Sequence, residues 1–241
     1  MELPAHMQPF VIDVKTRTAE RLGRVDLYLP DDLTRLAPAV VFVHGGPVPA
    51  DLQPTPRGWP AFQGYGSLTA ARGAVAATVD HQLHDLSSYP LAAADIIEAV
   101  EAVRADPRVD AARVALWFFS GGGLLLADWL RTPPDWLRCV AATYPWLAPP
   151  PDWDARWRAA EAVASAGDLP IVLTRAGLER PAVAAAVTAF VDAASDCGAR
   201  LEIIDVPNGQ HGFDTLDHTA ESREAVSRAL DSVLEFLGSR P

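Results

Sequence analysis

Short runs of β-branched residues alternate with alanine-rich segments along almost the whole chain. Eight such runs predict strands, and most of them end near proline, glycine or aspartate: residues 10–14, 24–30, 39–45, 74–80, 113–119, 138–144, 169–175 and 200–207. Apolar residues at helical spacing predict helices over 90–105, 181–196 and 219–238, and a further helix that opens at Gly121. This alternation is typical of an α/β protein with a mainly parallel sheet and helices on both faces. The first two runs have no helix between them, so we expect an antiparallel hairpin at one edge.

Two stretches interrupt the alternation, near residues 47–66 and 145–157. Both are rich in proline and aromatic residues, and each follows the end of a predicted strand. We therefore expect irregular loops or lids there, within a single domain that spans residues 1–241. Ligands of open α/β sheets bind at the carboxyl ends of the strands, so these loops are expected to border a site.

The composition indicates a protein with a sizeable core. Of its 241 residues, 49% are hydrophobic and 21% are charged. Acidic residues outnumber basic ones by 31 to 20, which gives a formal net charge of −11. Because the basic residues are also scattered, neither nucleic acid nor an anionic membrane is an expected partner.

Signals for targeting and for metal binding are lacking in the sequence. The N-terminal stretch MELPAHMQPFVIDVKTRTAERL has no basic start followed by an apolar run, and no apolar stretch reaches the roughly 18 residues of a membrane helix. We therefore expect a cytoplasmic protein. The two cysteines, Cys139 and Cys197, have neither CxxC nor Cys/His spacing, which argues against a structural metal.

The stretch FFSGG places Ser120 between a predicted strand and a predicted helix. A nucleophilic serine in an α/β fold sits on such a sharp turn, with small residues two positions before and two positions after it. Gly122 fits this pattern, whereas Phe118 does not. Serine is also a favoured helix N-cap, so the turn alone leaves both interpretations open.

A nucleophilic serine needs an imidazole to accept its proton and a carboxylate to orient that imidazole. His211 follows the last predicted strand in a turn flanked by glycines, and Glu179 follows the strand before it. We predict Ser120, His211 and Glu179 as the catalytic residues. Glutamate is also favoured by the dipole at a helix start, and Asp205 and Asp214 are rival acids.

The stretch VVFVHGGP ends a predicted strand in two glycines. Acyl transfer requires two N–H donors aimed at the developing oxyanion, and we predict Gly46 and Gly121 for this oxyanion hole. An ordinary glycine turn is the alternative. Aromatic residues near the strand ends predict an apolar substrate pocket that favours short-chain acyl or aryl esters. Its candidates are Trp59, Phe62, Tyr65, Phe119, Trp146 and Trp153.

Four motifs together resemble the α/β-hydrolase superfamily, in particular its dienelactone-hydrolase-like and esterase/lipase branches. They are HGGP at 44–47, FFSGGG at 118–123, AGLERP at 176–181 and GQHGFD at 209–214. The resemblance implies an eight-stranded sheet and a cofactor-free serine hydrolase that cleaves a carboxylic ester or thioester through an acyl-enzyme. The alternative is a non-hydrolytic protein on the same fold, either an acyltransferase, cyclase or lyase of natural-product tailoring or a small-molecule binder.

The chain departs from the family pattern at three positions. Phe118 replaces a small residue, Glu179 replaces the commoner aspartate, and Ser120 stands where dienelactone hydrolases proper have cysteine. If the turn forms, the Phe118 ring must enter space left by small residues such as Ala127 or Ala142, or the strand must lean away from the helix.

Overall fold

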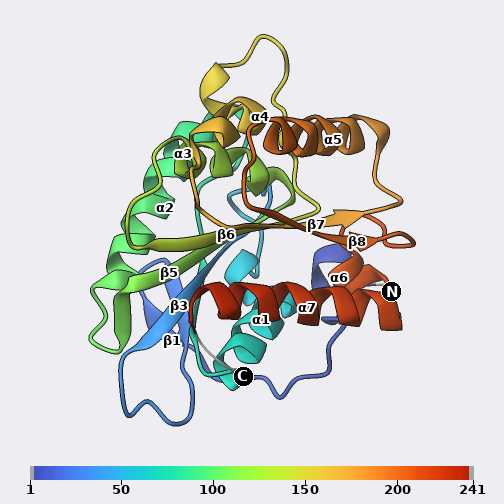
Figure 1. The fold of residues 1–241 in the computed structure, drawn as a ribbon. Coiled ribbons are helices and arrows are strands. Elements are labelled where there is room, and N and C mark those ends of the chain that lie inside the picture. Colours follow the sequence, from blue (N-terminus) through green and yellow to red (C-terminus); the bar gives the residue numbers. More distant parts are fainter. Residues whose placement is uncertain (1–2, 239–241) are drawn as a thin grey trace.

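The computed structural model describes residues 3–238, and its centre is an eight-stranded sheet (Figure 1). The strand order is β1-β2-β4-β3-β5-β6-β7-β8, with β3 to β8 parallel and β2 antiparallel to both of its neighbours. This confirms the predicted α/β architecture. The strands are β1 (Glu20–Leu22), β2 (Val25–Tyr28), β3 (Ala37–Val43), β4 (Val75–Val79), β5 (Val109–Phe119), β6 (Leu137–Thr143), β7 (Ile171–Ala176) and β8 (Leu201–Val206).

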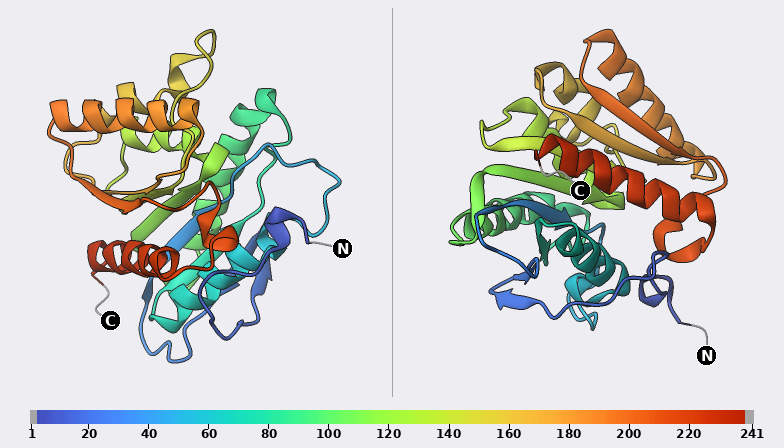
Figure 2. Two further views of the ribbon diagram at one scale, coloured as in Figure 1. Left: turned by 90° about the vertical axis from the view of Figure 1, so that its right-hand side faces the viewer. Right: turned by 60° about the horizontal axis from the view of Figure 1, so that its bottom comes forward.

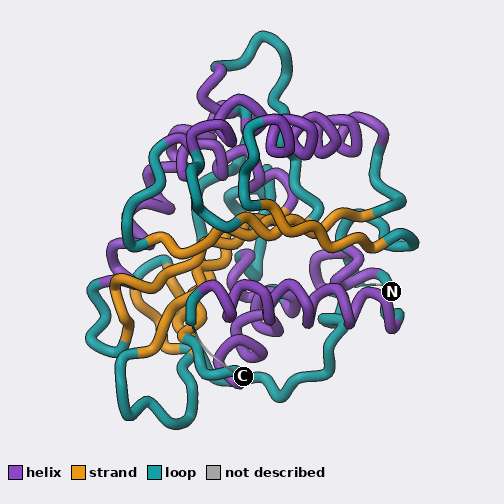
Figure 3. Tube along the Cα trace, in the orientation of Figure 1, coloured by secondary structure: helices purple, strands orange, loops and turns teal. Residues whose placement is uncertain are grey.

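Helices cover both faces of the sheet (Figures 2 and 3). One face carries α2 (Tyr89–Arg104), α3 (Leu126–Arg131), α4 (Ala159–Ala162) and α5 (Pro181–Asp196). The other face carries α1 (Pro60–Ala71), α6 (Phe213–Leu216) and α7 (Ala220–Phe236). Short 3-10 helices are η1 (Ala5–Met7), η2 (Pro56–Gly58), η3 (Leu86–Ser88), η4 (Ser120–Leu125), η5 (Ala155–Trp157) and η6 (Val163–Ser165). Within residues 3–238, no helix is both long enough and apolar enough to cross a membrane.

The central strand β5 contributes side chains to both layers of the core, because its side chains alternate between the two faces of the sheet. Leu116 and Phe118 pack into the buried cluster under α2 and α3, whereas Trp117 and Phe119 pack into the cluster under α1 and α7. Ser120 follows directly at the carboxyl end of this buried strand. The core on both faces thus fixes the position of the turn that carries Ser120.

The first predicted strand is wrong. Residues 10–14 do not join the sheet, and the edge hairpin is formed instead by β1 and β2. Phe10 and Val11 are buried against the α1 and α7 layer, and the Val11 N–H donates to the carbonyl of Asp214 at 2.9 Å. Their apolar side chains therefore pack into the core from an irregular segment, which the pattern of hydrophobic residues cannot distinguish from a strand.

The predicted irregular stretch 47–66 is partly wrong, because α1 begins at Pro60. Its glycines disfavour a helix in sequence-based prediction, but they permit close packing in the structure. A Cβ on Gly64 would lie 2.3 Å from the ring of Phe10, and one on Gly66 would lie 2.5 Å from the ring of Tyr28. The second stretch, 145–157, is irregular as expected apart from η5.

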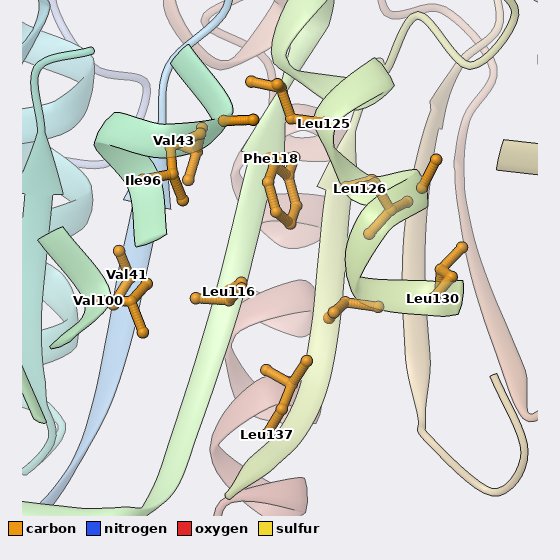
Figure 4. Packing of buried hydrophobic residues seen from close by; sticks show 14 of the residues in the cluster. Val41, Val43, Ile96, Val100, Leu116, Phe118, Leu125, Leu126, Leu130 and Leu137 are labelled. Carbon is orange, nitrogen blue, oxygen red and sulfur yellow. The ribbon is translucent and has the colours of Figure 1, made fainter. Parts of the chain in front are cut away.

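The Phe118 ring is fully buried on the α3 side of the sheet, among leucines of β5 and of the η4–α3 segment (Figure 4). The strand register pairs Phe118 with Ala142 on β6, and both residues belong to the same buried cluster. A small neighbour on the adjacent strand therefore leaves room for the ring, which is the first of the two arrangements expected from the sequence.

Replacing Phe118 by alanine should lower the free energy of unfolding by about 3–5 kcal/mol, because a fully buried aromatic ring is lost and a cavity is left. Phe118→Leu, which keeps most of the apolar volume, should cost under about 1.5 kcal/mol. Urea unfolding of both variants measures the difference. A loss of under about 1 kcal/mol for Phe118→Ala would contradict the tight packing described here.

Candidate active site

Ser120 is the first residue of η4, directly after β5, and its φ of 49° is in the strained left-handed region. Two glycines make this turn possible by close approach to the end of β3. A Cβ on Gly122 would lie 2.6 Å from the carbonyl oxygen of His44, and one on Gly45 would lie 2.7 Å from the Cβ of Ser120. Strain in a non-glycine residue is typical of a functional position.

The structure brings the three predicted catalytic side chains into one hydrogen-bonded chain. Ser120 Oγ lies 2.7 Å from His211 Nε2, and His211 Nδ1 is hydrogen-bonded to the Glu179 carboxylate. The Glu179 side chain is only 4% exposed, and its other oxygen accepts the Arg180 N–H at 2.8 Å. With Nδ1–H donated to the carboxylate, Nε2 is left to accept the Ser120 proton, so this arrangement can activate the hydroxyl.

Neither rival acid hydrogen-bonds to His211 in the described structure. Asp205 points outward and pairs with Arg175 at 2.7 Å. Asp214 is buried and accepts hydrogen bonds from the hydroxyls of Tyr65 at 3.0 Å and Tyr144 at 2.8 Å. Sequence alone left three acids open, and the geometry favours Glu179.

A backbone hydrogen bond from Trp146 orients the peptide group between Ser120 and Gly121. The Ser120 carbonyl accepts the Trp146 N–H at 2.8 Å, and because N–H and C=O of a trans peptide point in opposite directions, the Gly121 N–H points away from Trp146. The Gly121 carbonyl in turn accepts the Tyr89 hydroxyl at 2.7 Å. A Cβ on Gly121 would lie 2.1 Å from the Gly46 carbonyl oxygen, so the two predicted oxyanion donors belong to backbone segments in direct contact.

A buried pair of histidines supports the loop that carries Gly46. The rings of His44 and His81 stack with centroids 3.6 Å apart. His44 Nδ1 is 2.5 Å from the Gly45 carbonyl, and His81 Nε2 is 3.0 Å from the His44 carbonyl. Burial lowers the pKa of His44 to about 4 and that of His81 well below its usual value, so both rings are neutral donors.

The sequence analysis missed this pair, although a signal existed. One histidine follows β3 directly and the other closely follows β4, and adjacent parallel strands end side by side.

A cavity of about 320 Å³ opens at Ser120 and His211. Three of the predicted pocket residues line it, namely Trp59, Phe62 and Phe119. The other three lie elsewhere. Tyr65 is buried beneath the cavity, and Trp146 and Trp153 pack against the opposite layer of the core, where Trp153 contacts Tyr89. Loop 145–157 follows β6 toward α3 and α4, which carries its tryptophans away from the cavity.

The cavity also has lining residues that the sequence analysis missed. Tyr144, with a φ of 38°, stands directly after β6, and Thr215 and Leu216 follow from α6. Ala5 and His6 come from the N-terminal turn η1. The position of Tyr144 at a strand end was a usable signal, whereas nothing in the sequence links the N-terminal turn to this cavity.

Asp214 makes stability depend on pH. Burial raises its pKa to about 6, against the opposing hydrogen bonds from Tyr144 and Tyr65. The folded state therefore favours the protonated acid, and this stabilisation is present below pH 4 and lost as pH rises through 6. The free energy of unfolding of the native protein minus that of Asp214→Asn should fall by about 2 kcal/mol between pH 4 and pH 7. Urea unfolding across this range measures it, and a constant difference would contradict the assignment.

Comparisons with known proteins identify the family and the fold. The family model described as "Dienelactone hydrolase family" matches residues 66–240. A search of curated proteins finds no match. Thermogutta terrifontis esterase 2 phosphonylated by sarin is similar in structure, at 19% identity and a TM-score of 0.69, with 97% of this chain and 98% of that chain covered. Esterase Est22 is similar at 18% identity and a TM-score of 0.69, with 98% and 83% covered.

Proposed function

The chain belongs to the dienelactone hydrolase family, and we propose that it is a serine hydrolase that cleaves a carboxylic ester or thioester through an acyl-enzyme on Ser120. The observation that carries this proposal is the hydrogen-bonded chain of Ser120, His211 and Glu179 beyond the carboxyl ends of β5, β8 and β7. Serine, rather than cysteine, is the nucleophile in this proposal, and glutamate takes the role of the orienting acid.

In the proposed mechanism, the Ser120 hydroxyl attacks the ester carbonyl while His211 Nε2 accepts its proton. Glu179 stabilises the resulting imidazolium and fixes its orientation. The N–H groups of Gly46 and Gly121 stabilise the oxyanion. His211 then gives its proton to the departing alcohol or thiol, and a water molecule activated by His211 hydrolyses the acyl-enzyme.

The substrate class follows from the cavity. A volume of about 320 Å³ is at the small end of ligand pockets, and aromatic side chains form much of its wall. We expect short-chain acyl or aryl esters. The phosphonylation of Thermogutta terrifontis esterase 2 by sarin supports the proposal of a covalent mechanism in a protein of this fold.

The observation that had suggested the non-hydrolytic alternative does not support it. It rested on Phe118, whose ring could have distorted the turn, but that ring lies in the core and Ser120 contacts His211 at 2.7 Å. A product formed without incorporation of water would favour an acyltransferase, cyclase or lyase over the hydrolase.

Labelling with a fluorophosphonate tests the proposal directly. We expect covalent modification of Ser120, located by mass spectrometry of the peptide, together with turnover of short esters or thioesters in a broad panel. A folded protein that is never labelled at Ser120 would contradict the proposed function.

A further inference from the structure

Six rings form a continuous aromatic row along the cavity, from the N-terminal turn to the histidine of the site. In order, they are His6, Trp59, Phe62, Phe119, Tyr144 and His211. Successive ring centroids lie 4.8, 6.2, 5.3, 6.1 and 4.9 Å apart. These separations fit direct aromatic contact, so the row is one packed surface. His211 stands at its reactive end, and His6 stands at the other.

The polar atoms of Trp59 and Tyr144, in the middle of the aromatic row, are already engaged by the protein. Trp59 Nε1–H donates to the Pro54 carbonyl at 3.0 Å, and the Tyr144 hydroxyl donates to Asp214. Both oxygens of Asp214 accept tyrosine hydroxyls in turn. The middle of the row therefore presents ring faces and edges to a ligand, and the Asp214 carboxyl beside it is occupied by these hydroxyls. Such a surface suits a hydrocarbon chain or an aryl group.

The N-terminal turn is held in place at the cavity. It closes on itself through the Met7 N–H, which donates to the Pro4 carbonyl at 2.8 Å. The following segment is tied to the site by the Val11 N–H, which donates to the Asp214 carbonyl. The turn η1 contacts both α1 and α6, and it lies beside α6 in the ribbon views (Figure 2). Ala5 and His6 are thus a fixed part of the cavity wall.

This part of the wall is separate from the part of the chain that the family model describes. The family model matches residues 66–240, whereas His6, Trp59 and Phe62 precede that range. The match to the family model therefore does not extend to these three residues of the wall.

We propose that His6 is a specificity-determining residue: it closes the apolar end of the cavity and limits the length of the acyl or alcohol group that the site accepts. The proposal rests on the proposed function of Ser120. Because the imidazole packs on Trp59 at the end of the aromatic row, a smaller side chain lengthens the cavity there and a larger one shortens it.

The test compares the native protein with His6→Ala, His6→Trp and the matched control Leu3→Ala. Leu3 belongs to the same segment but is 55% exposed. Each protein is assayed with p-nitrophenyl esters of increasing acyl length and with acetates of increasing alcohol length, and each is labelled at Ser120 with a small fluorophosphonate.

We expect His6→Ala to raise the ratio of kcat/KM for hexanoate over acetate, or for the corresponding alcohols, about tenfold, and His6→Trp to lower it about tenfold. Leu3→Ala should keep the native ratio. The series that shifts identifies whether the acyl or the alcohol group occupies the row. Normal labelling of Ser120 with unchanged length profiles in both His6 variants would overturn this inference alone. Absence of labelling in all four proteins would overturn the proposed function, and the inference with it.

Discussion

Ser120→Ala should lower kcat for any accepted ester by about a million-fold, because the attacking atom is removed and the remaining members of such a triad act only with it. His211 and Glu179 are expected to stay in place, since their own hydrogen bond does not involve Ser120. The measurement is ester turnover together with fluorophosphonate labelling, both of which should be lost. The fold should persist, because the left-handed backbone conformation at position 120 costs alanine about as much free energy as it costs serine.

A matched control is Ser165→Ala, which removes an exposed hydroxyl in η6 on the helical layer. Its activity and labelling should equal those of the native protein. Retention of more than about a hundredth of native turnover by Ser120→Ala would show that another group carries out the attack.

Gly121→Ala should lower kcat about a thousandfold while KM changes little. The added Cβ would lie 2.1 Å from the carbonyl oxygen of Gly46, and both partners are backbone, so the turn and the loop must separate. That separation displaces the two proposed oxyanion donors together. Loss of a single donor of this kind costs about 100- to 1000-fold in kcat, and the contact is made mainly in the transition state.

The matched control is Gly23→Ala in the β1–β2 turn. Gly23 has a φ of 58° and no atom within 4 Å of an added Cβ, so the substitution should cost about 1 kcal/mol of stability with native activity. Urea unfolding of both variants separates loss of stability from loss of catalysis. Activity of Gly121→Ala within tenfold of native would contradict the proposed oxyanion hole.

Much of the candidate site was predictable from local sequence. Buried parallel strands read as continuous apolar runs, and their ends are marked by polar or glycine residues. Ser120 and Glu179 follow such runs, His211 follows the partly exposed edge strand β8, and parallel strands bring their carboxyl ends to one edge. Local pattern therefore led to the three residues that the structure joins by hydrogen bonds.

Long-range packing was beyond the sequence. Asp214 and Glu179 were both acceptable acids by position, and only the hydrogen bonds from Tyr65 and Tyr144 show that Asp214 is engaged elsewhere. The bond from Tyr65 spans 149 residues of chain. Helix α1 was not predicted for a related reason. Its glycines leave space for the rings of residues that are distant along the chain, and the helix backbone itself does not need them.

The sequence by itself determined the α/β class of this protein, the order of its parallel strands along the chain and the residues at their ends. These depend on periodicity and on composition within a few residues. The tertiary structure alone decided which acid faces His211, how Phe118 is accommodated beside Ala142, and that the N-terminal turn lines the cavity with His6 packed on Trp59. Such choices depend on side chains that are remote along the chain, and their contacts exist only once the sheet and its two helical layers have packed.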